Sequence, residues 1–265
     1  MEINIILDND KVWLLNTVRR LIVKLKKNNI KINYIWVLPE KLSNLKGYKI
    51  TLWYFKIFGI VVFLKLVLFH LVVLIINFLK GNNSHQKLAE SYDIKFEYIK
   101  SLKDKKLLTK LNNRRKNYNL IFTNHIINKR LLKLKNNYFI NKHSSLLPAF
   151  GGLLPFIWTK IFNFPNGVTF HLVDNNIDSG KIIFQKKIHK RFMSMIEFYL
   201  YIYEKTPEYM IKSILNLKNQ KFIKSKYKKS IFSLPEKTEY KRFLDCGGKI
   251  ININDLLSIN KIIKK

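Results

Sequence analysis

The chain has 265 residues, enough to bury a full hydrophobic core, and a formal net charge of +32 at pH 7. Its 42 lysines are spread along the whole length against only 7 arginines, the better forks for phosphate, so the charge argues against a specific nucleic-acid binder. A lone cysteine, Cys246, excludes a disulfide within the chain and a thiolate metal site, and the N-terminus lacks the pattern of a secretory signal peptide, so we expect a cytoplasmic protein.

Strands alternate with helices over most of the chain. Apolar runs predict strands at 4–9, 32–38, 95–99, 118–123, the start of 140–152, 167–173 and 181–188. Amphipathic spacing predicts helices at 11–27, 85–94, 102–113 and 154–162. This alternation is typical of an α/β fold with a mainly parallel sheet and helices on both faces.

After residue 190 the pattern changes. A long helix near 193–219 is followed by a basic, strand-like piece, by SLPEKTEYKRFL and by a polar tail. We therefore divide the chain into a domain of residues 1–190 and a helical and irregular extension of residues 191–265.

The segment 51–80 is an apolar insert in this pattern. Residues 57–79 are long enough to cross a bilayer, but Lys65 and His70 lie inside, and a central lysine costs about 3 kcal/mol on insertion scales. A single span would also separate the first two strands from the strands that should pair with them. We therefore expect a helix or helix pair that makes peripheral contact with a membrane or packs on the protein.

Two polar side chains end the buried strand in INKHSSLLPAFGG. Because residues two apart in a strand face the same way, Asn141 and His143 can point together at the carboxyl end of the sheet, where open α/β sheets bind ligands. The later polar loop HLVDNNIDSG offers Asp174 and Asp178, and a carboxylate there could orient His143 and stabilise its protonated form. An Asn amide is a hydrogen-bond donor for a developing oxyanion. Together these groups suit acyl transfer to an amine.

The two motifs together resemble a family signature. N-x-H-x-S-L-L-P with its following glycines, then G-V-T-x-H and I-D-S-G, is similar to the pattern of folate-dependent formyltransferases. That family includes glycinamide ribonucleotide formyltransferase and methionyl-tRNA formyltransferase. The similarity is strongest over 118–190 and weaker over 1–50 and 82–117.

The resemblance implies a Rossmann-like formyltransferase fold with Asn141, His143 and Asp178 as the catalytic residues. It also implies 10-formyltetrahydrofolate as the formyl donor, a small-molecule amine as the acceptor, and no metal. The residues assigned to the donor are His125, Ile126, Ile127 and Asp174. The residues assigned to the support of the site or to the substrate are Ser145, Gly152 and His171.

The acceptor is less well defined by the sequence. Acceptors in the family include purine nucleotides, aminoacyl-tRNA and amino sugars on nucleotide carriers. The apolar insert at 51–80 and the short extension after 190 differ from the purine and tRNA members, so we expect an amino sugar on a nucleotide carrier. The alternatives are methionyl-tRNA or glycinamide ribonucleotide formyltransferase activity. A rival of another class is a catalytically inactive membrane-surface or RNA-binding protein.

Overall fold

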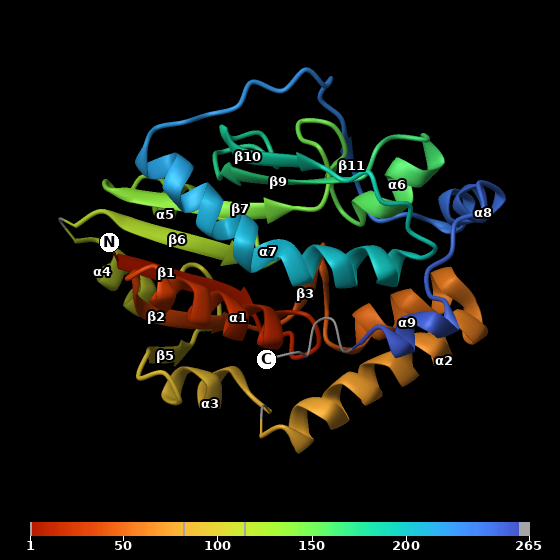
Figure 1. Cartoon of the computed structure of the whole chain (residues 1–265), viewed down its shortest axis with the longest axis horizontal. Coiled ribbons are helices and arrows are strands. Elements are labelled where there is room, and N and C mark those ends of the chain that lie inside the picture. The colour runs from red at the N-terminus through yellow and green to blue at the C-terminus, as the bar shows by residue number, and fades with distance from the viewer. Residues whose placement is uncertain (1, 82, 114, 260–265) are drawn as a thin grey trace.

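A seven-stranded sheet forms the centre of the computed structural model, which describes residues 2–81, 83–113 and 115–259. The strands of this sheet are β1 (Glu2–Asp8), β2 (Lys31–Leu38), β5 (Lys95–Tyr98), β6 (Asn117–Phe122), β7 (Asn137–His143), β9 (Gly167–Leu172) and β10 (Ile182–Lys187). Their order is β10-β9-β7-β6-β1-β2-β5 (Figure 1). The strands from β7 to β5 are parallel, whereas β9 runs antiparallel to both β7 and β10. The predicted, mainly parallel sheet is therefore confirmed.

Helices cover both faces of this sheet. The helices are α1 (Leu14–Lys27), α2 (Tyr48–Leu79), α3 (His85–Glu90), α4 (Lys105–Leu111), α5 (Lys129–Leu132), α6 (Pro155–Ile161), α7 (Met195–Lys218), α8 (Lys237–Asp245) and α9 (Ile253–Leu257). Because side chains alternate along a strand, Ile5 and Val37 face the core that includes α1 and α7, while Ile6 and Trp36 face the core under α4 and α5. Figure 1 shows α1 and α7 together on the near face of the sheet.

Two elements differ from their predicted extents because of local backbone geometry. The helix expected at 85–94 ends at Glu90, since Asp93 has a positive φ of 54° and Ile94 N–H bonds back to the carbonyl of Ala89. The helix expected from 102 begins at Lys105, where the side chain of Asp104 accepts a hydrogen bond from the backbone N–H of Lys106.

The basic, strand-like piece after α7 forms an isolated bridge from Ile223 to Ile182 and otherwise pairs over two residues. These form β11 (Ile231–Phe232), which runs parallel to β8 (Gly151–Gly152). A further hairpin joins β3 (Lys41–Leu42) to β4 (Leu45–Lys46). The pairing of β11 with β8 brings the extension beside the loop that follows β7.

The apolar insert is a kinked helix packed on the protein along one stripe. Two helical segments of α2 meet at Gly59, whose φ of 78° and ψ of 168° suit glycine. Its buried side chains are those of Phe58, Leu66, Phe69, Val73 and Asn77. By length and composition, Tyr48–Leu79 could also cross a membrane.

The helix after residue 190 shares the core of the preceding residues. Phe198, Leu200 and Ile214 of α7 are buried in the same cluster as Ile5 of β1. The change of pattern near residue 190 therefore lies inside one packed unit, and the last six residues of the predicted tail lie outside the described residues.

Candidate active site

Asn141, His143 and Asp178 meet at the carboxyl edge of the sheet. Asn141 and His143 end β7, and Asp178 lies in the turn between β9 and β10. His143 Nδ1 lies 3.4 Å from Asp178 Oδ2. The structure thus brings together the three residues that the resemblance assigned to catalysis.

His171 on β9 links Asn141 to Asp178. Its Nδ1 lies 2.8 Å from the carbonyl oxygen of Leu172, which can only accept, so Nδ1 carries a proton. Its Nε2 lies 3.4 Å from Asn141 Nδ2 and 3.5 Å from Asp178 Oδ1. His171 Nε2 therefore lies between the Asn141 amide and the Asp178 carboxylate and joins the two side chains. The supporting role predicted for His171 agrees with this geometry.

His143 has an acceptor at each ring nitrogen. Nε2 donates to the carbonyl oxygen of Phe150 at 2.8 Å, and Nδ1 faces the carboxylate of Asp178. Burial lowers the pKa of His143, while Asp178 and the Phe150 carbonyl act to raise it, and the net direction is downward. The imidazolium form of His143 therefore depends on the charge of Asp178.

Asp178 stays ionised in this buried position. Burial acts to raise its pKa, but His143, His171 and the backbone N–H of Gly152 together hold the pKa of Asp178 well below its ordinary range. The Gly152 N–H donates to Asp178 Oδ2 at 2.8 Å. Gly152 has a φ of 94°, and a Cβ there would lie 2.0 Å from the carbonyl oxygen of Phe232, so this position requires glycine.

Ser145 holds the loop after β7 from within. Its side chain is fully buried, and its Oγ donates to the carbonyl of Ala149 at 2.8 Å. Thr169 Oγ1 donates to the carbonyl of Ser145 at 2.7 Å and accepts from Leu147 N–H at 3.0 Å. Ser145 therefore positions the loop and offers no surface to a substrate.

The residues predicted to bind the donor lie around this site. Within the part of the chain that the structure describes, none of them forms a hydrogen bond with Asn141, His143 or Asp178. His125 Nε2 donates to the Pro39 carbonyl at 2.9 Å; Ile126 is exposed and Ile127 is buried. Asp174 is exposed and accepts from Asn176 N–H and from the Ser179 hydroxyl, so it caps its own turn.

Two ionisable groups at this edge were not predicted from the sequence. Burial raises the pKa of Asp8, at the end of β1, to about 7, although Thr123 Oγ1 and Asn124 N–H donate to its carboxylate. Burial lowers the pKa of Lys142 to about 7, and its Nζ lies 4.1 Å from the centre of the Tyr203 ring. An ionisable side chain at the end of an otherwise apolar strand was the available signal for both.

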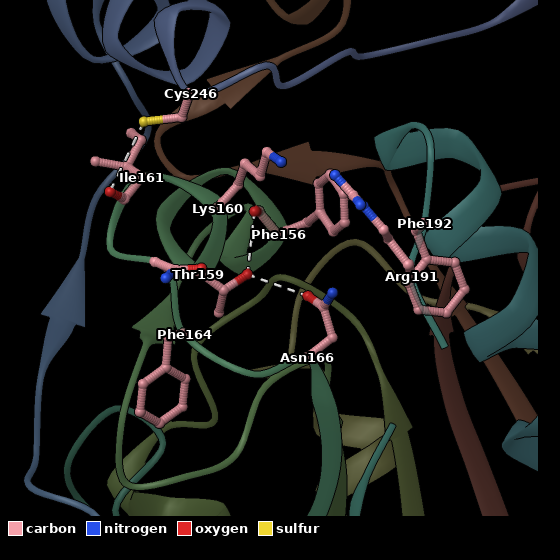
Figure 2. A pocket seen from close by; sticks show the side chains of 10 residues that line it. Phe156, Thr159, Lys160, Ile161, Phe164, Asn166, Arg191, Phe192 and Cys246 are labelled. Carbon is pink, nitrogen blue, oxygen red and sulfur yellow. Dashed lines mark hydrogen bonds between the residues drawn. The ribbon is translucent and has the colours of Figure 1, made fainter. Parts of the chain in front are cut away.

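A cavity of about 450 Å³ lies away from these residues, between α6, the segment before β9 and the region of α8. Figure 2 shows the side chains that line it, among them Lys160, Asn166 and Arg191. None of the catalytic candidates lines this cavity, so the chemistry of the Asn141–His143–Asp178 site gives better grounds for a functional assignment than cavity size does.

Comparisons with known proteins agree with the site. The family model described as Formyl transferase matches residues 82–194. The methionyl-tRNA formyltransferase of Thermodesulfovibrio yellowstonii is 38% identical over 64 residues, which cover 24% of this chain and 21% of that protein. The match therefore spans about a fifth of the length of that relative.

Solved structures extend the likeness to nearly the whole chain. A sugar N-formyltransferase from Shewanella sp. FDAARGOS_354 has a TM-score of 0.54 at 16% identity, covering 99% of this chain and 87% of that one. The N-formyltransferase from Helicobacter canadensis, in complex with folinic acid and dTDP-3-aminofucose, has a TM-score of 0.52 at 17% identity, covering 93% and 81%. At these identities the likeness establishes the fold.

The sheet order and the likeness to solved structures define an α/β protein with a formyltransferase fold. Residues 82–194, which contain Asn141, His143 and Asp178, match the family model described as Formyl transferase. The resemblance predicted from the two motifs is confirmed.

Proposed function

We propose that the protein transfers a formyl group from 10-formyltetrahydrofolate to a primary amine. The observation that carries the proposal is the set of contacts that joins Asn141, His171, Asp178 and His143 at the carboxyl edge of the sheet. Family membership of the surrounding residues supports the same reaction.

In the proposed mechanism the acceptor amine attacks the formyl carbon. The Asn141 amide, held by His171, donates to the oxygen that becomes negative, and the imidazolium of His143 stabilises that charge at short range. Asp178 favours the protonated form of His143, against the lowering of its pKa by burial. When the carbon–nitrogen bond to the folate breaks, the proton released by the amine passes to N10 of the folate, so charge and atoms balance.

The donor is proposed to lie against the backbone of residues 125–127 and the turn at 174–178. Ile126 follows β6 at the same edge of the sheet, and its exposed side chain offers apolar surface there. A flat, partly apolar ring system fits such a surface better than a strongly anionic group does, because Asp8 and Asp178 are both near this edge.

For the acceptor we propose an amino sugar on a nucleotide carrier. Solved neighbours described as sugar N-formyltransferases align with nearly the whole chain, and the Helicobacter canadensis protein was solved with a nucleotide-linked amino sugar. Methionyl-tRNA and glycinamide ribonucleotide are the alternative acceptors, and the identity to a methionyl-tRNA formyltransferase over 64 residues favours testing the first.

The test is turnover of 10-formyltetrahydrofolate against these three classes of amine. We expect release of tetrahydrofolate, monitored by its absorbance, only with an amino sugar nucleotide. We expect His143→Ala to lose this activity. Turnover confined to methionyl-tRNA or glycinamide ribonucleotide would change the acceptor but keep the reaction. A folded protein that binds no folate and turns over with none of the amines would instead support an inactive membrane-surface or RNA-binding protein.

A further inference from the structure

The second segment of α2 exposes a continuous apolar face. Its large apolar side chains are each between 37% and 76% exposed, and they recur at helical spacing on the side opposite the buried stripe. We call this set the α2 apolar face: Ile60, Val61, Leu64, Val67, Leu68, Leu71, Leu74, Ile75, Phe78 and Leu79. A contiguous exposed apolar face of this kind marks a site of interaction with a partner.

The opposite stripe fixes how α2 is oriented. Asn77 is buried; its Oδ1 accepts from Asn16 Nδ2 at 2.7 Å and its Nδ2 donates to the carbonyl of Lys11 at 3.1 Å. Phe69 stacks on Trp13 at 5.4 Å between ring centres. Rotating α2 about its axis to bury the α2 apolar face would break these contacts, so the face remains exposed.

The charged residues of α2 itself are all lysines. Lys65 borders it, and Lys56 and Lys80 lie near its two ends, all three exposed. From residue 41 to residue 89 the sequence has seven lysines and no Asp or Glu. Lysine stems can lie along an apolar surface while their ammonium groups reach a layer of negative charge. An anionic partner with an apolar interior matches both features.

We propose that α2 docks the protein on a bilayer containing anionic phospholipids, with the helix in the plane of the interface. A second copy of this chain is a poorer match, because pairing two such faces would bring lysine against lysine with no carboxylate in the segment. The packed stripe also disfavours a single span, since crossing the bilayer would break the Asn16–Asn77 hydrogen bond. Tyr48, exposed at the start of α2, adds an aromatic group of the kind found at membrane interfaces.

Docking in this way would place the active-site edge of the sheet near the membrane. The end of α2 is tied to the loop after β1 through Lys11, and the buried His85 lies 3.0 Å from the carbonyl of Asp10 in the same loop. Figure 1 shows α2 on the side towards which the arrows of β1 and β6 point. The proposal does not depend on the formyl-transfer reaction, and vesicle binding tests it separately.

The test is flotation of the full chain with vesicles of phosphatidylcholine alone or of phosphatidylcholine with phosphatidylglycerol. The variant is the triple change Leu64→Glu, Leu68→Glu and Leu71→Glu. We expect the parent to float with the phosphatidylglycerol vesicles, and the triple variant to lose roughly a hundredfold or more in partition, because charges replace three exposed leucines that the bilayer would bury.

The matched control moves the same charges elsewhere. Leu215→Glu, Leu244→Glu and Ile253→Glu replace exposed apolar residues on α7, α8 and α9 and change the net charge by the same amount. We expect this control to float as the parent does, with thermal unfolding of both triple variants near that of the parent. Equal losses in the two triple variants, no flotation of the parent, or a parental dimer that only the α2 variant dissociates would each overturn the proposal. Resistance to alkaline carbonate extraction would overturn it in favour of a span.

Discussion

Replacing Asp178 by asparagine removes one negative charge from the site and preserves the size of the side chain. The carboxylate lies 3.4 Å from His143 Nδ1, and the two side chains are only 8% and 10% exposed, so solvent screens the pair weakly. Two unit charges at that distance interact by about 5 kcal/mol at an effective dielectric constant of about 20. Part of that energy returns because a neutral amide is easier to bury. We therefore expect kcat/KM to fall by about 10²–10³, or about 3–4 kcal/mol.

The pH profile of Asp178→Asn gives a second, independent measurement. Asp178 raises the pKa of His143 against the effect of burial, so the pKa of His143 falls further in the variant and its imidazolium exists only at more acidic pH. The activity that remains should therefore have its optimum at lower pH. Initial rates of 10-formyltetrahydrofolate consumption across pH test this, with Asp245→Asn, an exposed carboxylate at the end of α8, as the control. A parental rate and an unshifted profile in Asp178→Asn would refute the reasoning.

Three further predictions concern the site and its supports. Asn141→Ala and His143→Ala should each lower kcat by about 10²–10³, and the double variant by much less than the product of the two, because the residues act on one oxyanion; full multiplicativity in the kinetics would contradict this. Gly152→Ala should lower the unfolding free energy by more than about 2 kcal/mol in denaturant titrations, because its Cβ would meet the backbone of Phe232. Gly247 also has a positive φ but lies in open space, so Gly247→Ala should lower it by about 1 kcal/mol. Equal losses in the two variants would argue against the contact at Gly152. Burial raises the pKa of Asp8 to about 7, so the stability that its protonated form contributes is lost as pH rises through about 7. The Tm of Asp8→Asn should consequently fall less than that of the parent between about pH 5 and about pH 8, and parallel curves would speak against that pKa.

Much of the fold could be predicted because the central strands are short apolar runs between amphipathic helices. The placement of Asn141 and His143 followed from the two-residue repeat of a strand, which needs no knowledge of the neighbours. The choice between Asp174 and Asp178 did not follow from the residues, since both lie in one polar loop. In the structure the Gly152 N–H and two histidines surround Asp178, while Asp174 bonds only within its own turn. The family motif supplied that choice.

What could not be predicted depends on segments far apart in the chain. Asp8 has its pKa raised by burial and accepts from Thr123, which lies 115 residues later. Lys142 faces away from the catalytic side of β7 and meets Tyr203 of α7, so its surroundings are set by helix packing. A pattern that reads one segment at a time has no access to either environment, nor to the two-residue pairing of β11.

The pairing of β11 with β8 determines when the loop after β7 can fold during translation. Ser230 accepts hydrogen bonds from the backbone N–H groups of Phe150, through its Oγ, and of Gly151, through its carbonyl, and the Phe232 carbonyl accepts from Leu153 N–H. These amides belong to the loop whose Phe150 carbonyl accepts the hydrogen bond from His143 Nε2. A nascent chain that has emerged only as far as α7 has no partners for them. The catalytic loop therefore takes its final form only after residues 230–232 have emerged from the ribosome.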